Sequence, residues 1–116
     1  MGKVEMYVIL WTFEVHPEKV DAFVAAYKSE GAWAQLFAQA EGYLGTELLR
    51  SIDGDGRAEF VTIDRWQSSE HFAQFRTQFD TRYRTLDTEC EGMTLNERKL
   101  GRSSAKVELQ DSLRRL

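Results

Sequence analysis

The sequence predicts a single α+β domain of order β-α-β-β-α-β, with a four-stranded antiparallel sheet and its helices on one face. Apolar runs with strand-like alternation flank stretches with helical spacing, and the Asp-Gly-Asp-Gly sequence at 53–56 is typical of a tight turn between two strands. The length of 116 residues suits one domain. We expect this domain to span residues 1–102, with residues 103–116 as a C-terminal tail or short helix.

The first half of the chain is expected to supply one strand and a helical region. Residues 4–15 predict a strand that is apolar on both faces. Pro17 suits the first position of the following helix, where a backbone N–H would have no intrahelical partner. A second short helical piece covers residues 32–40, and Gly42 closes it.

A change of hydrophobic period at Trp66 marks the second half. Up to Trp66 the residues suit a half-buried strand, whereas from Phe72 onward aromatic residues recur at helical spacing. Ser68 or Ser69 can cap this helix by accepting a hydrogen bond from a backbone N–H. Trp66 is therefore expected at a strand end, facing the mouth of a cleft between helix and sheet. The predicted elements are strands over 43–51, 57–66 and 93–100 and one helix over 69–88.

Both faces of the predicted sheet are apolar, but the helices cover only one. The other face needs a partner, and a second copy of the chain in a two-fold homodimer is the simplest one. The net charge of −4 argues against a nucleic-acid partner. No apolar run approaches the length of a membrane-spanning helix, so we expect no membrane contact and a cytoplasmic location.

Motifs for metals, cofactors and protein nucleophiles are missing from the sequence. The turn at 53–56 lacks the ligands of a calcium loop, and no second histidine or cysteine is spaced to bind a metal with His71. Cys90, which has no cysteine to pair with, is expected to be a reduced structural thiol. We therefore expect neither a metal nor a cofactor.

Aromatic and charged residues supply the candidate site. A set of aromatic residues either lines a flat cavity between helices and sheet or is simply core. His71 is either a general base or a residue at a helix boundary. Asp64 and Arg65 point to opposite faces of their strand, and the one that points inward needs a ligand or, as we favour, a charge at a dimer interface. The aromatic set is Trp11, Tyr27, Trp33, Tyr43, Trp66, Phe75 and Tyr83.

Residues 4–100 resemble the antibiotic biosynthesis monooxygenase (ABM) family. The resemblance rests on three stretches, at 7–13 (YVILWTF), 40–47 (AEGYLGTE) and 61–68 (VTIDRWQS). It implies a ferredoxin-like fold, a dimeric α+β barrel, and a pocket in each subunit between sheet and helices. Trp66 matches a tryptophan that the family commonly has at the end of the third strand. The Asn, Trp and His of the haem-degrading branch are replaced by Trp11, Phe75 and Tyr83.

The resemblance implies a cofactor-independent monooxygenase that acts on a small electron-rich aromatic compound, either a quinol or a polyketide-like molecule. The expected catalytic residues are Trp66, which orients the ring, with Tyr83 and Arg65, which stabilise oxyanion charge; Tyr43 and Arg76 are the alternatives for these last two roles. The alternatives are a non-catalytic dimer that binds a small ligand and a haem-handling protein. The expected substrate-binding residues are Trp11, Tyr27, Trp33, Tyr43, His71 and Phe75.

Overall fold

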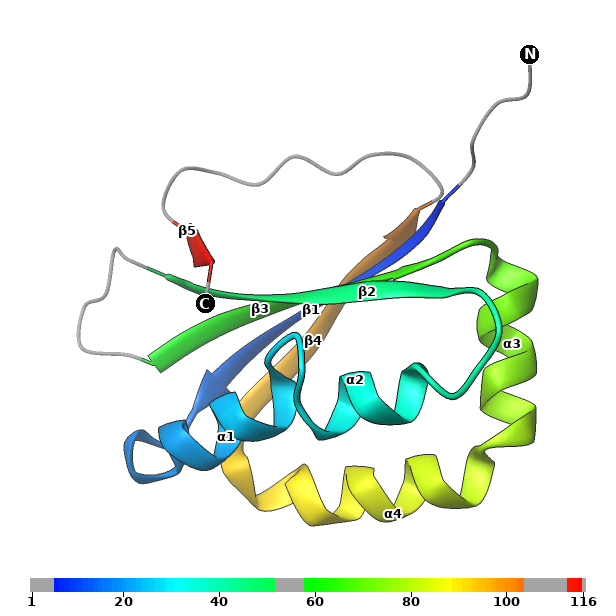
Figure 1. The fold of residues 1–116 in the computed structure, drawn as a ribbon. Helices are drawn as coiled ribbons and strands as arrows, with labels where there is room; N and C mark the ends of the chain where they lie inside the picture. Colours follow the sequence, from blue (N-terminus) through cyan, green and yellow to red (C-terminus); the bar gives the residue numbers. More distant parts are fainter. Residues whose placement is uncertain (1–5, 52–57, 104–112, 116) are drawn as a thin grey trace.

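A computed structural model describes residues 6–51, 58–103 and 113–115. The strands form one antiparallel sheet in the order β4-β1-β3-β2-β5. Helices α1, α2 and α4 lie along one face of this sheet and α3 lies at its end (Figure 1). The predicted α+β, ferredoxin-like fold class is confirmed. The elements are β1 (Tyr7–Val15), the 3-10 helix η1 (Pro17–Lys19), α1 (Val20–Tyr27), α2 (Ala32–Phe37), β2 (Tyr43–Ser51), β3 (Ala58–Trp66), α3 (Ser69–Gln78), α4 (Asp80–Cys90), the 3-10 helix η2 (Glu91–Met93), β4 (Thr94–Ser103) and β5 (Leu113–Arg115).

Aromatic side chains fill the layer between helices and sheet. Trp66, at the end of β3, is 0% exposed and packs against the rings of Phe37 and Phe75, both at the helix layer. Phe23 of α1 is also 0% exposed and stacks on Tyr27 at 4.2 Å between ring centroids. Burying large aromatic side chains is the main favourable term in a domain of this size.

The helix predicted over 69–88 is divided in two. At Phe79 the backbone leaves the helical region (φ −113°, ψ 26°), and α4 begins at Asp80 in a new direction (Figure 1). The amide of Phe79 still donates to the carbonyl of Phe75, and the amide of Tyr83 donates to that of Phe79. Backbone hydrogen bonding thus continues through the corner. Because no glycine or proline lies there and the hydrophobic spacing continues, the sequence did not indicate the break.

The C-terminal segment contributes a strand where a tail or short helix was expected. Leu113–Arg115 pairs as β5 with the edge of β2. The predicted turn at 53–56 and residues 104–112 and 116 lie outside the described part of the chain. Among the described helices, none is long and apolar enough to cross a membrane.

Part of the sheet face opposite the helices is already buried in the single chain. Val8, Leu10, Leu49 and Ile63 form a cluster on this face, and each is at most 8% exposed. This buried cluster therefore gives less reason for a homodimer than a fully open apolar face would. The homodimer itself stays a prediction.

Gly42 allows a close approach of the chain to α3. Its φ is +91°, and a Cβ atom built on it would lie 2.3 Å from Cγ of His71. We expect Gly42→Ala to lower the free energy of unfolding by about 1–3 kcal/mol, because the left-handed backbone and the clash both oppose a side chain. Urea denaturation measures the change. Gly92→Ala is the control, since its Cβ would meet nothing within 4 Å, and equal losses in both variants would contradict the explanation.

Candidate functional site

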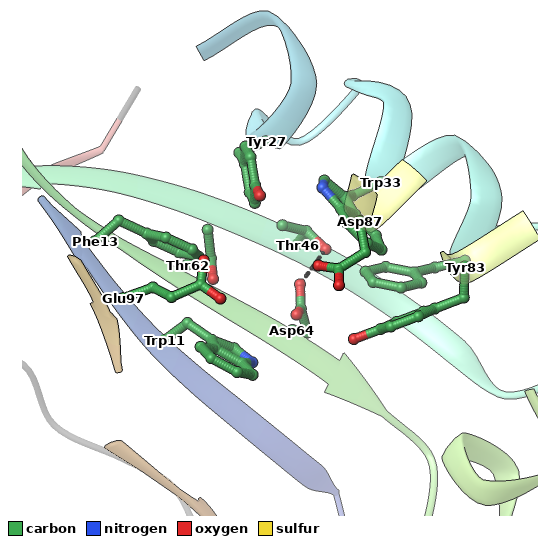
Figure 2. Close-up of a pocket in the computed structure, with 11 residues that line it drawn as sticks. Trp11, Phe13, Tyr27, Trp33, Thr46, Thr62, Asp64, Tyr83, Asp87 and Glu97 are labelled. Atoms are coloured by element: carbon green, nitrogen blue, oxygen red, sulfur yellow. Dashed lines mark hydrogen bonds between the residues drawn. The ribbon is translucent and has the colours of Figure 1, made fainter. Parts of the chain in front are cut away.

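A cavity of about 70 Å³ lies between the sheet and the helices (Figure 2). Its floor comes from β1, β2, β3 and β4, and its roof from α1, α2 and α4. Chain segments far apart in sequence thus converge on one space. The lining residues are Trp11, Phe13, Tyr27, Trp33, Phe37, Thr46, Thr62, Asp64, Tyr83, Asp87 and Glu97.

The walls of the cavity are largely aromatic. The ring of Trp33 meets that of Tyr83 edge to face at 5.1 Å and lies 6.0 Å from that of Tyr27. Burial raises the pKa of both tyrosines above the ordinary value of 10, so both phenols are protonated hydrogen-bond donors at neutral pH. The cavity therefore offers apolar aromatic faces and hydrogen-bond donors to a small ligand.

Asp64 places a carboxylate among the aromatic side chains that line the cavity. Its Oδ1 accepts a hydrogen bond of 2.7 Å from the hydroxyl of Thr46, which is 2.6 Å from the hydroxyl of Tyr43. Burial raises the pKa of Asp64 from 3.8 to about 6, and the hydrogen bond from Thr46 limits the rise. A carboxylate with a pKa near 6 is ionised at neutral pH and is basic enough to accept a proton from a ligand.

Two further carboxyl groups face the cavity from the side of α4 and β4. Burial raises the pKa of Glu97, and the charge of nearby Asp87 raises it further. Among the described residues no basic side chain lines the cavity, and no group of three or more potential metal ligands is placed to hold an ion. The site thus favours neutral or hydrogen-bond-donating ligands and disfavours anions.

Of the residues predicted for the site, the structure brings together Trp11, Tyr27, Trp33 and Tyr83, which all line the cavity. Tyr43 does not line it but is linked to Asp64 through Thr46. Phe75 is core, 1% exposed, with its ring against those of Phe37 and Trp66.

Three other predicted site residues lie elsewhere. Trp66 is enclosed by aromatic rings and lies behind the cavity wall. His71 lies at the start of α3, where its Nδ1 is 2.7 Å from the hydroxyl of Ser68. Arg65 points to the opposite face of β3 from Asp64 and forms an ion pair of 2.7 Å with Glu47. The guanidinium carbon of Arg76, the alternative to Arg65, lies 3.8 Å from the ring centre of Tyr83, and Arg76 does not line the cavity.

Thr46, Asp87 and Glu97 line the cavity but were not predicted as site residues from the sequence. A charged residue pointing inward on β3 was predicted, but its partner was assigned to a dimer interface. The structure instead pairs Asp64 with Thr46 of the same chain. A polar residue facing inward on each of two neighbouring strands is the signal that could have indicated this pair.

Comparison with known proteins identifies proteins that are similar to this chain. A family model described as "Antibiotic biosynthesis monooxygenase" matches residues 6–80. No curated protein sequence matches the chain. Among solved structures, SnoaB from Streptomyces nogalater, described as a cofactor-independent oxygenase, has 21% sequence identity and a TM-score of 0.67, covering 92% of this chain and 99% of that chain.

Two further structures show the same fold. A putative antibiotic biosynthesis monooxygenase from Nitrosomonas europaea has 16% identity and a TM-score of 0.67, with 90% of this chain and 94% of that chain covered. A dimeric ferredoxin-like protein from an uncultured marine organism has 13% identity and a TM-score of 0.59, with 95% of both chains covered.

Proposed function

Because the chain belongs to the antibiotic biosynthesis monooxygenase family, we propose that it is a cofactor-independent monooxygenase acting on a small, electron-rich hydroxylated aromatic compound. The observation that carries this proposal is the carboxylate of Asp64 inside an aromatic cavity, with no basic side chain among the described lining residues to neutralise it. The description of SnoaB as a cofactor-independent oxygenase supports it.

The proposed reaction begins with proton transfer. Asp64 takes the proton of a ring hydroxyl, and the electron-rich ring then forms a C–O bond with O₂ at a carbon that carries hydrogen. The proton on Asp64 passes to the outer oxygen to give a hydroperoxide. Loss of the C–H proton breaks the O–O bond, leaving a ring carbonyl and water. Overall a phenol and O₂ give a quinone and water, and the substrate supplies all four electrons that reduce O₂.

Tyr83 and Tyr27 are the proposed hydrogen-bond donors to the developing oxygen charge. Both phenols are kept protonated by burial, and Figure 2 shows the hydroxyl of Tyr83 directed toward Asp64. Trp11 and Trp33 are proposed to hold the ring between their faces. A cavity of about 70 Å³ must widen to admit even a single-ring quinol, and it would have to widen much further for a polycyclic compound, so we propose a single-ring substrate.

A homodimer is also part of the proposal, with one cavity in each subunit and a cytoplasmic location. The marine relative described as dimeric supports the assembly. Native mass spectrometry of the purified chain tests it, because one spectrum reports both subunit number and any retained small molecule. A monomer at micromolar concentration would contradict the dimer.

Oxygen consumption tests the reaction. With a panel of hydroquinones we expect one O₂ used per quinone formed, and one atom of ¹⁸O₂ in the product. A hydroquinone that carries a carboxylate should react about tenfold more slowly or worse, because like charges face each other across the cavity. Tight binding of a quinol without any oxygen uptake would favour the non-catalytic binding dimer instead.

A further inference from the structure

We propose that Thr46 and Tyr43 are positioning residues for Asp64, whose hydroxyls hold one carboxylate oxygen so that the other is free to receive the substrate proton. This inference rests on the proposed function, since it concerns the base of that reaction. It assigns a role to two residues of β2, one of which does not line the cavity.

The three side chains form a continuous hydrogen-bonded chain across the β2–β3 hairpin. Thr46 lies directly opposite Asp64 in the register of the two strands, so both side chains project to the same face of the sheet. The distances are 2.6 Å from Tyr43 Oη to Thr46 Oγ1 and 2.7 Å from Thr46 Oγ1 to Asp64 Oδ1. Both distances lie within the normal range for hydroxyl hydrogen bonds, and the 2.7 Å distance to Oδ1 is compatible with an ionised acceptor.

The direction of this chain follows from counting protons. An ionised Asp64 has no proton to donate, so the single hydroxyl proton of Thr46 must point to Oδ1. Thr46 can then only accept from Tyr43, whose phenol is therefore the donor. Oδ2 of Asp64 receives no hydrogen bond from a described residue, and Asp64 lines the cavity. The geometry thus leaves one oxygen occupied and one available to a ligand.

The side chains around Asp64 leave the Thr46 hydroxyl as the group that stabilises its ionised form. The titratable side chains around Asp64 are Tyr43 on β2, Tyr27 on α1, Tyr83 and Asp87 on α4 and Glu97 on β4. None of these supplies a positive charge, and Arg76 lies on the ring of Tyr83 and does not line the cavity. Within the described part of the chain, the Thr46 hydroxyl is the donor that stabilises the ionised form of Asp64.

Tyr43 is held in place by the aromatic core. Its ring lies 5.3 Å from that of Trp66 and 5.5 Å from that of Phe37, both at tilted or edge-to-face angles. Trp66 thereby contributes to the site indirectly, because it packs against Tyr43 and fixes the phenol that donates to Thr46. A donor already polarised by another hydroxyl forms a stronger hydrogen bond to the carboxylate.

The experiment compares three variants. Thr46→Val removes the hydroxyl at nearly constant shape, Thr46→Ser keeps it, and Tyr43→Phe removes only the outer donor. Carboxyl carbon NMR gives the pKa of Asp64 in each protein, and kcat/KM is followed from pH 5 to 9. We expect Thr46→Val to raise the pKa of Asp64 by about one unit, the size of one lost charge-assisted hydrogen bond.

This shift has a pH signature that a merely structural change would not give. A rise of about one unit lowers kcat/KM about fivefold at pH 6 and leaves it nearly unchanged at pH 8.5, because the base is then ionised in both proteins. Thr46→Ser should restore the wild-type profile, and Tyr43→Phe should fall between the two.

The outcomes separate this inference from the proposed function. If Thr46→Val leaves both the Asp64 pKa and the pH profile of an active enzyme unchanged, the positioning role is wrong while the oxygenase activity stands. If no quinol is oxidised but the NMR pKa rises in Thr46→Val and returns in Thr46→Ser, the hydroxyl chain acts as proposed and the assigned reaction is wrong. A loss that is equal at all pH values would also overturn the positioning role.

Discussion

Asp64→Asn is expected to lower kcat by about 10²–10⁴-fold, the usual contribution of a general base. The amide matches the carboxylate in shape and its oxygen can still accept the hydrogen bond from Thr46, so the cavity should keep its form. Oxygen uptake with the best quinol measures the effect, and Glu59→Gln, which removes an exposed carboxylate from the same strand, is the control. Turnover within about threefold of wild type would remove Asp64 from the reaction.

The same substitution is expected to stabilise the protein. Because the folded pKa of Asp64, about 6, lies above its ordinary value of 3.8, the unfolded chain binds its proton less tightly than the folded one. The ionised group therefore costs stability as pH rises from about 4 to 6, and the whole cost is present above that range. Asp64→Asn should raise the free energy of unfolding by about 1–3 kcal/mol at pH 7.5 and by almost nothing at pH 4. Denaturation at both pH values checks this sign.

Trp66→Ala is expected to cost about 3–5 kcal/mol of stability, because it empties the centre of the aromatic core. Trp66 is 0% exposed and contacts the rings of Phe37, Tyr43, Phe72 and Phe75. Chemical denaturation gives the loss, with Leu44→Ala as the control because Leu44 is 52% exposed. A loss below about 1 kcal/mol would contradict the central packing role.

Trp66→Phe separates this packing role from a direct catalytic one. Phenylalanine retains part of the aromatic contact, so we expect a folded protein with kcat reduced only a few-fold. A large fall in kcat in a protein of unchanged stability would restore the role that the family resemblance suggested for Trp66.

Strands β1 to β4 were predictable because each has a clear local signal, whereas β5 was not predicted. The period of the apolar residues changes at Trp66, and a proline or a glycine lies between most elements. The break at Phe79 has neither, and residues on both sides of it keep helical spacing. In the structure α3 lies at the end of the sheet and α4 along its face, an arrangement that a single sequence does not display (Figure 1).

The hydrogen-bond partner of Asp64 was harder to predict than the face of the sheet to which the Asp64 side chain points. In the structure Thr46 pairs with Asp64 and Arg50 with Phe60, which fixes the register of β2 on β3. The sequence marks the turn only as the stretch 53–56. A shift of one residue in register moves every side chain of β2 to the other face, so the turn motif alone could not place Thr46 beside the carboxylate.

The aromatic residues were predicted as a set, but not their division between cavity and core. Trp11 and Trp33 line the cavity whereas Trp66 and Phe75 do not. All four have the same hydrophobic character, and only the three-dimensional position of the empty space distinguishes them.

The proposed base and the hydroxyls that hold it all lie on one hairpin, β2–β3, whereas the surrounding wall comes from α1, α2, α4, β1 and β4. This separation has an evolutionary consequence. Mutations of helix residues other than Tyr27, Phe37 and Tyr83 can reshape the space for a new compound without disturbing the groups proposed to carry the chemistry. Divergence within such a fold should therefore change substrates more readily than chemistry, and gene duplicates could acquire new substrates in few steps.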